Sequence, residues 1–102
     1  MTNTEKKKLL QGLDANRNFR ETIYYEALET LGDIKPNYSD YMITEPINCD
    51  EELKRLPKAD YELCSALLTM LLREDHFSNG SFERRCRDGL VQPIIDRMIS
   101  QL

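Results

Sequence analysis

The sequence predicts an all-α fold, a compact and mostly helical single-domain bundle of residues 1–102 around a central buried helix at about residues 60–76. Three observations support this prediction. The 102 residues are 40% hydrophobic, enough to form one core without metals or disulfides. Only 4 Gly and 4 Pro interrupt the chain. Apolar side chains recur at helical spacing along most of it, most densely after Pro57.

The first two helices are predicted from a capping signal and from an apolar stripe. Thr2 and Glu5 fit a T-x-x-E capping box, which predicts a short helix to about Leu10, frayed within residues 1–12. A second helix is predicted over residues 16–31, because apolar residues follow one another there at i, i+4 steps. That apolar face consists of Phe19, Ile23, Ala27 and Leu31, with Tyr24 and Leu28 beside them.

The middle of the chain, residues 33–48, is the least regular part of the sequence. Pro36 and Pro46 break helices, and several side chains that favour turns lie between them. Residues 41–44 are predicted to form a short extended segment, which is too isolated to make a sheet. Residues 50–56 are then predicted to form one or two helical turns, with acidic residues in the first turn.

The helix at residues 60–76 is predicted to be the centre of the fold. Its apolar residues span an arc of roughly 240° on a helical wheel, and a helix that is apolar nearly all round is enclosed by other helices. The remaining narrow strip is predicted to be polar and wet, and it consists of Glu62, Ser65, Thr69 and Arg73.

The C-terminal third is predicted to be a turn followed by two helices. Ser78-Asn79-Gly80 is a strong turn signal, with a short helix over residues 81–88 and a last helix over residues 90–102. Phe77 and Phe82 are expected to bracket this turn and plug the helix ends. The acids at the end of the central helix, Glu74 and Asp75, oppose its dipole, so Arg84 or Arg85 is expected to offset them.

Charge and hydropathy indicate a cytoplasmic protein that does not cross a membrane. No stretch approaches the roughly 18 apolar residues that span a bilayer. The polar N-terminal segment with Lys6, Lys7 and Lys8 has no apolar core like that of a secretory signal. The 3 Cys are an odd number and include no C-x-x-C pair, so we expect buried or half-buried thiols.

The sequence contains no recognisable catalytic, cofactor or metal motif, so we predict a non-enzymatic protein without a cofactor or a bound metal. His76 is the single His, and its neighbours Glu74 and Asp75 point in other directions on a helix. An enzyme centred on His76 is kept as a third hypothesis. The Cys residues do not add the spaced ligands that a metal needs, and no phosphate-binding glycine loop occurs.

A cluster of arginines is the strongest feature in favour of a nucleic-acid partner. Arg84, Arg85 and Arg87 lie on one short predicted helix that is followed by another, an arrangement that resembles a helix-turn-helix. Gly89 alone makes too short a junction for that motif. The net charge is −4, and residues 13–62 carry twelve acidic groups against six basic ones. No segment is therefore basic enough to form a surface that binds a nucleic-acid phosphate backbone.

Residues 67–98 carry a pattern of a Leu-Thr-rich helix, an R-x-[DE]-[RH]-F-x-x-G turn, a short helix, a glycine and a closing helix. The matching residues are Leu68, Thr69, Arg73, Asp75, His76, Phe77, Gly80, Asp88, Gly89, Ile95 and Arg97, while Met98 stands where the pattern has Leu. In this pattern the segment resembles a family of small bacterial helical domains of unknown function. The resemblance implies a helical fold and a bacterial or mobile-element origin, and it implies no reaction.

These residues have a structural and a functional interpretation. In the structural one, Arg73 ties the turn by binding backbone carbonyls or Asp88. In the functional one, Arg73, Asp75, His76 and Arg85 belong to a shared ligand or partner site.

We therefore predict a protein-interaction module that binds another protein or a second copy of itself. The alternative is a nucleic-acid-associated accessory or regulatory factor that uses Arg84, Arg85 and Arg87. Tyr25 is added to the candidate surface because it points away from the apolar stripe of its helix, and Tyr suits contact patches. The candidate interaction residues are Arg73, Asp75, His76, Arg84, Arg85, Arg87 and Tyr25.

Overall fold

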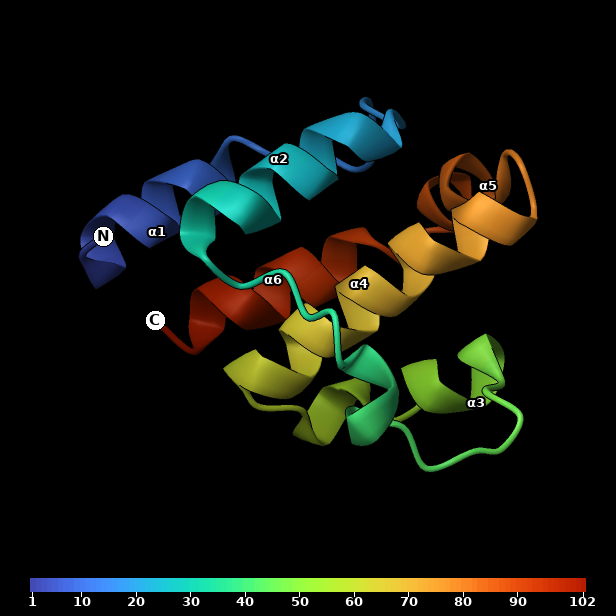
Figure 1. Cartoon of the computed structure of the whole chain (residues 1–102). Helices are drawn as coiled ribbons and strands as arrows, with labels where there is room; N and C mark the ends of the chain where they lie inside the picture. The colour runs from blue at the N-terminus through green and yellow to red at the C-terminus, as the bar shows by residue number, and fades with distance from the viewer.

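The centre of the fold is helix α4 (Tyr61–Phe77), around which five further α-helices and two 3-10 turns are arranged (Figure 1). The computed structural model describes all 102 residues and contains no strand, so the predicted all-α fold is confirmed. The chain forms one compact globule of 36 × 26 × 22 Å. The other elements are α1 (Asn3–Gln11), α2 (Glu21–Leu31), η1 (Tyr38–Tyr41), α3 (Cys49–Leu53), η2 (Leu56–Lys58), α5 (Ser81–Arg87) and α6 (Gln92–Ser100).

Helix α4 is enclosed as predicted. Nine consecutive residues of it, 64–72, are buried. Helices α2, α3, α5 and α6 and turn η1 all contact it, which explains how a helix can be apolar around so much of its circumference. The helix begins after Asp60, whose carboxylate accepts a hydrogen bond from the Leu63 N–H at 2.8 Å.

The prediction of a wet polar strip on α4 is wrong for its middle, although Glu62 at one end is exposed. Ser65 and Thr69 are buried under the segment that leads to η1. The Thr69 hydroxyl donates to the Ser65 carbonyl at 2.8 Å and accepts from the Lys35 N–H at 3.3 Å. Small hydroxyl groups can be buried at low cost because the carbonyls of their own helix accept their protons.

Helix α1 begins with the predicted capping box. The Thr2 N–H donates to the Glu5 carboxylate at 3.0 Å, and the Glu5 N–H donates to the Thr2 hydroxyl at 3.1 Å. Leu10 at the other end is fully buried and ties the helix to the core. Helix α1 packs on α2 and α6.

Helix α2 begins at Glu21, five residues later than predicted. The preceding turn is held by the side chains of Asp14 and Asn18, each of which accepts a hydrogen bond from the backbone N–H two residues on. Buried Tyr24 also donates its hydroxyl to the Asn18 carbonyl at 2.7 Å. These local bonds compete with helix formation, and periodicity alone does not detect them.

The predicted extended segment at residues 41–44 forms no strand, although the backbone of Met42 is extended (φ −89°, ψ 149°). Tyr41 is the last residue of the 3-10 turn η1, and residues 42–44 wrap around the carboxylate of Glu52 in α3, which is fully buried. That carboxylate accepts hydrogen bonds from the backbone N–H groups of Ile43 at 3.0 Å and Thr44 at 2.7 Å. The helical turn predicted near residue 50 is confirmed as α3, with Asn48 as its cap.

The two phenylalanines near the α4–α5 turn have opposite environments. Phe82 is fully buried, as predicted, and its ring packs on Tyr24 with 5.0 Å between centroids. Phe77 does not plug the helix end, because its side chain is 88% exposed. The turn between them needs a residue with positive φ, and Gly80 (φ 86°) supplies it.

The environments of the three cysteines agree with the expectation of buried or half-buried thiols. Cys64 and Cys86 are buried and Cys49 is half-buried, all as free thiols. No helix of the chain combines the length and the apolar character that a bilayer crossing requires. Helix α6 has Pro93 in its first turn, where the missing N–H costs nothing.

Candidate functional site

The end of α4 separates the candidate residues onto two faces. Successive residues of a helix point about 100° apart, whereas residues four apart share a face. Asp75 and His76 therefore border hollows beside α2, while Arg73 and Phe77 border a hollow beside α3 and η1. The two faces have different chemistry.

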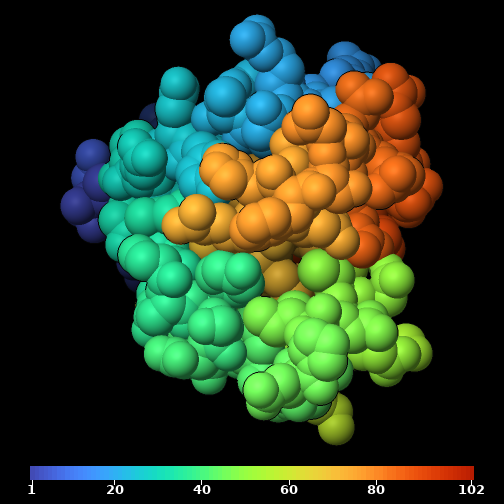
Figure 2. Space-filling view, turned by 45° about the vertical axis from the view of Figure 1, so that its right-hand side comes forward, coloured from blue at the N-terminus to red at the C-terminus, as the bar shows by residue number.

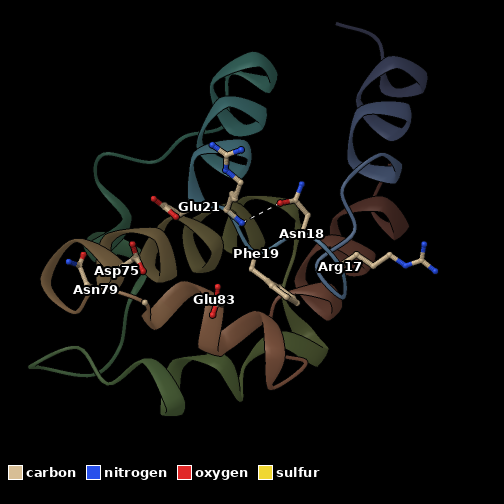
Figure 3. A pocket seen from close by; sticks show the side chains of 9 residues that line it. Arg17, Asn18, Phe19, Glu21, Asp75, Asn79 and Glu83 are labelled. Atoms are coloured by element: carbon tan, nitrogen blue, oxygen red, sulfur yellow. Dashed lines mark hydrogen bonds between the residues drawn. The ribbon is translucent and has the colours of Figure 1, made fainter.

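The face beside α2 is polar. An open hollow of about 460 Å³ lies between the start of α2 and the start of α5 (Figure 3). An adjoining hollow of about 420 Å³ brings together three of the predicted residues, Tyr25, Asp75 and His76. The first hollow is lined by Arg17, Asn18, Phe19, Arg20, Glu21, Asp75, Asn79, Gly80 and Glu83.

Asp75 and His76 do not form an acid–base pair. The Asp75 carboxylate accepts a hydrogen bond from the Phe82 N–H at 3.1 Å, so it caps the start of α5. The His76 imidazole is exposed and makes no hydrogen bond to a carboxylate. A general base needs such an orienting partner to hold its ring, so this pair offers a contact surface rather than positioned chemistry.

Of the two arginines predicted to offset the acids at the end of α4, Arg85 does so, and it pairs with Glu74 but not with Asp75. Its guanidinium donates two hydrogen bonds to the Glu74 carboxylate, from Nε at 3.0 Å and from Nη2 at 2.8 Å. It also pairs with Asp50 of α3. The hydrogen bonds from Arg85 hold the pKa of Glu74 below its ordinary value. Arg85 therefore joins α3, α4 and α5 and is not available to an external ligand.

The other two arginines of the cluster also differ in availability. The Arg87 guanidinium lies 4.5 Å from the centroid of the Phe19 ring and pairs with Glu83 at 3.3 Å. Arg84 is exposed and has no ion pair or hydrogen bond. The three arginines thus do not form one free cationic surface, and the nucleic-acid alternative stays a prediction that rests mainly on Arg84.

The face beside α3 and η1 is apolar, and sequence reasoning missed it. Phe77, Ile43 and Ile47 are 88%, 73% and 36% exposed, and with Met1 they are the exposed large hydrophobic residues of the chain. Ile47 borders two hollows of about 270 Å³ and 490 Å³. Figure 2 shows this face, with a recess between the end of α4 (orange) and the green segment beneath it.

We call the lining of these two hollows the Ile47 surface. Phe77 and Arg73 border the smaller hollow, and Ile43 and Glu45 border the larger one. The smaller hollow is completed by Tyr38, Ile47, Cys49, Met70, Glu74 and Ser78, and the larger by Ser39, Met42, Thr44, Pro46 and Ile47.

Two charged residues on the Ile47 surface have no partner. Arg73 is half-buried and makes no ion pair or hydrogen bond, so the prediction that it ties the turn is wrong. Glu45 is exposed and likewise has no ion pair or hydrogen bond. The turn is held instead by Asp75 and by Arg85. In the sequence, the signal for this surface was the pair of isoleucines, Ile43 and Ile47, on either side of Pro46 in the least regular part of the chain.

Acid is expected to weaken the junction between α4 and α5. Because the pKa of Glu74 lies below 4.5 in the folded protein, the carboxylate stabilises the fold above that pH, and this contribution is lost as the pH falls through the folded-state pKa. We expect the free energy of unfolding of the wild type to fall more steeply below about pH 5 than that of Glu74→Gln.

Urea unfolding at a series of pH values measures this difference. The control is Glu83→Gln, which removes an exposed carboxylate paired with Arg87 and should leave the slope unchanged. Parallel curves for the wild type and Glu74→Gln would show that Glu74 is not the source of the acid sensitivity.

Comparison with known proteins places residues 9–102 in one family. No three His, Cys, Asp or Glu side chains of the chain are grouped so as to hold a metal ion. Neither the search of curated proteins nor that of solved structures found a match. The profile of a family of unknown function, DUF6508, matches residues 9–102, which include every helix from α2 to α6. The chain belongs to this family of unknown function.

Proposed function

We propose that this protein is a non-enzymatic protein-interaction module that docks a partner protein on the Ile47 surface, in the cytoplasm of a bacterial cell. The observation that carries the proposal is the position of Phe77, Ile43 and Ile47. These are three of the four exposed large hydrophobic residues of the chain, and they border two adjoining hollows. A contiguous apolar patch with a polar rim is typical of a protein-binding site.

The composition of this surface suits a protein partner. Aromatic side chains, Phe among them, and arginines are enriched at protein interfaces, and this surface offers Phe77 and Arg73 together. Phe77 does nothing for the core, because 88% of its side chain is in water. Burying it against a partner therefore releases apolar surface from water without disturbing the fold.

The polar face beside α2 supports an enzymatic function less well. Its hollows are open, its carboxylate Asp75 is engaged by the backbone of α5, and its imidazole is exposed. Active sites are concave and hold their titratable groups in fixed geometry. The Ile47 surface is therefore the stronger candidate for function.

Affinity capture with two matched variants tests this proposal. We expect Phe77→Ser to lose at least one protein that the wild-type bait captures, and Glu29→Ser on the exposed face of α2 to keep it. Both variants should unfold within about 0.5 kcal/mol of the wild type, because both sites are exposed. Quantitative mass spectrometry of captured proteins, with an untagged copy of the chain present, measures the difference.

The proposal is wrong if no captured protein distinguishes Phe77→Ser from Glu29→Ser. Thermal unfolding of each bait by circular dichroism confirms beforehand that the comparison is between folded proteins.

A further inference from the structure

We propose that the partner seated on the Ile47 surface is a second copy of this chain, related to the first by a two-fold axis. This inference rests on the proposed function, since it names the occupant of the same surface. It follows from the way apolar and charged side chains are distributed on the two sides of Ile47.

The Ile47 surface has two unlike ends. The end formed by α4 carries one highly exposed apolar side chain, Phe77, and one unpaired cation, Arg73. The end formed by the segment after η1 carries one highly exposed apolar side chain, Ile43, and one unpaired anion, Glu45. Ile47 borders both hollows and therefore lies between the two ends.

A two-fold axis converts this arrangement into a set of matched contacts. In a symmetric dimer each residue that contacts a second residue across the interface is repeated with the roles exchanged. If the axis passes near Ile47, the Phe77 end of one copy faces the Ile43 end of the other. Arg73 then meets Glu45 of the other copy, twice in the dimer, and apolar side chains meet apolar side chains.

Charge complementarity of this kind selects the second copy over an unrelated protein. Arg73 and Glu45 both lack a partner inside the chain, whereas Glu74, the remaining charged residue that borders the two hollows, pairs with Arg85. An unrelated partner would have to supply an anion and a cation at matching positions. The second copy carries both already.

The dimer is expected to be weak. A standard interface takes about 800 Å² from each partner, roughly a seventh of the 5931 Å² that the chain exposes. The exposed apolar residues are few, and each copy carries a net charge of −4, which opposes association at long range. At physiological ionic strength this repulsion is screened beyond about 8 Å, while the two Arg73–Glu45 contacts lie within that distance.

Charge reversal and double reversal test the proposal by sedimentation equilibrium. The wild type is measured from about 10 μM to about 1 mM, the range in which a small interface associates. Arg73→Glu and Glu45→Arg should each raise the dimer dissociation constant about 10- to 100-fold, because each places two like-charge contacts in the dimer. The combined variant, Arg73→Glu with Glu45→Arg, should restore association to within a few-fold of the wild type.

Matched controls separate the loss of the Arg73–Glu45 contacts from the change in the net charge of the chain. Glu29→Arg on α2 and Arg20→Glu beside it make the same changes of charge away from the Ile47 surface and should leave dimerisation unaltered. Both residues are exposed and unpaired, so their variants should fold. Phe77→Ser should also weaken the dimer, because it removes the most exposed apolar side chain of the interface.

Each outcome bears on one of the two proposals. A wild type that remains monomeric throughout, or a dimer that the charge reversals do not weaken or the double variant does not restore, overturns the second copy as the partner. If Phe77→Ser still loses a captured protein of another sequence, the protein-interaction function stands without self-association. If neither association nor capture depends on Phe77, both proposals are wrong.

Discussion

Replacing Glu52 with Gln is expected to destabilise the fold by about 2 to 4 kcal/mol, the largest effect predicted for any polar residue of the chain. The Glu52 carboxylate is fully buried and collects four donors. They are the Ile43 N–H, the Thr44 N–H, the Thr44 hydroxyl and the Arg55 guanidinium, the last at 2.8 Å. A carboxamide has one oxygen to accept with and cannot neutralise Arg55.

The electrostatics of this carboxylate show why the loss is large. Burial by itself raises the pKa of Glu52, but the hydrogen bonds from Thr44, Arg55 and Ile43 outweigh burial and hold the pKa below its ordinary value. The folded protein therefore stabilises the charged form of Glu52. Arg55 also donates to the Tyr41 carbonyl at 2.7 Å, so the same cluster holds both sides of the loop after η1.

Chemical unfolding of Glu52→Gln beside Glu51→Gln measures the effect. Glu51 precedes it in α3 but is exposed and pairs only with Lys54, so its substitution should cost no more than about 0.5 kcal/mol. If the two variants unfold at the same denaturant concentration, the buried carboxylate does not organise this loop. A loosened loop should also weaken any contact made through Ile43 and Ile47, which flank it.

Truncating Leu71 to Ala is expected to cost about 2 to 5 kcal/mol, because it opens a cavity in the middle of α4. Leu71 is fully buried in the nine-residue stretch that five other elements enclose. Surrounding side chains cannot move far into the space, since the interior is close-packed on every side of this helix. With stability of about 5 to 15 kcal/mol typical of a small domain, the variant should be close to unfolding.

Thermal and urea unfolding test this expectation against Leu71→Met and Glu29→Ala. The methionine conserves volume and should cost less than about 1.5 kcal/mol. Glu29→Ala changes an exposed helix residue and should stay within about 0.5 kcal/mol of the wild type. A small effect of Leu71→Ala would mean that α4 is not the enclosed centre of the fold.

Stability and binding are thus expected to respond to different residues. Glu52 and Leu71 act through the interior, whereas Phe77 and Arg73 lie on the surface and take no part in the core or its ion pairs. Variants of the second pair should unfold like the wild type while losing association. Because the residues proposed for binding differ from those that stabilise the fold, binding can be tested without disturbing the fold.

Local signals in the sequence were sufficient for the helices themselves. Hydrophobic periodicity identified α4 and its burial, and the capping box of Thr2 and Glu5 marked the start of α1 correctly. These features depend on residues within one or two turns of each other, so they can be interpreted without knowing the fold. The acids at the end of α4 likewise indicated that Arg84 or Arg85 would be needed there, and the structure shows that it is Arg85.

Contacts between distant parts of the chain decided the rest. Thr69 is buried because the segment at Lys35 lies over it. Arg85 is ion-paired because folding brings Asp50 and Glu74 close to it. In the sequence, Glu52 is one of several acidic residues in a predicted helical turn. In the fold its carboxylate is buried, and the loop after η1 is hydrogen-bonded around it.

The sequence by itself therefore determined that the chain is helical, where most helices lie and which one is central, because apolar spacing and capping act locally. Only the tertiary structure decided which polar groups are buried, which arginines are free, and that Phe77, Ile43 and Ile47 share one exposed face. The physical reason is that burial and pairing are set by neighbours in space, which can be distant in the chain: Lys35 and Thr69 are 34 positions apart, and Asp50 and Arg85 are 35.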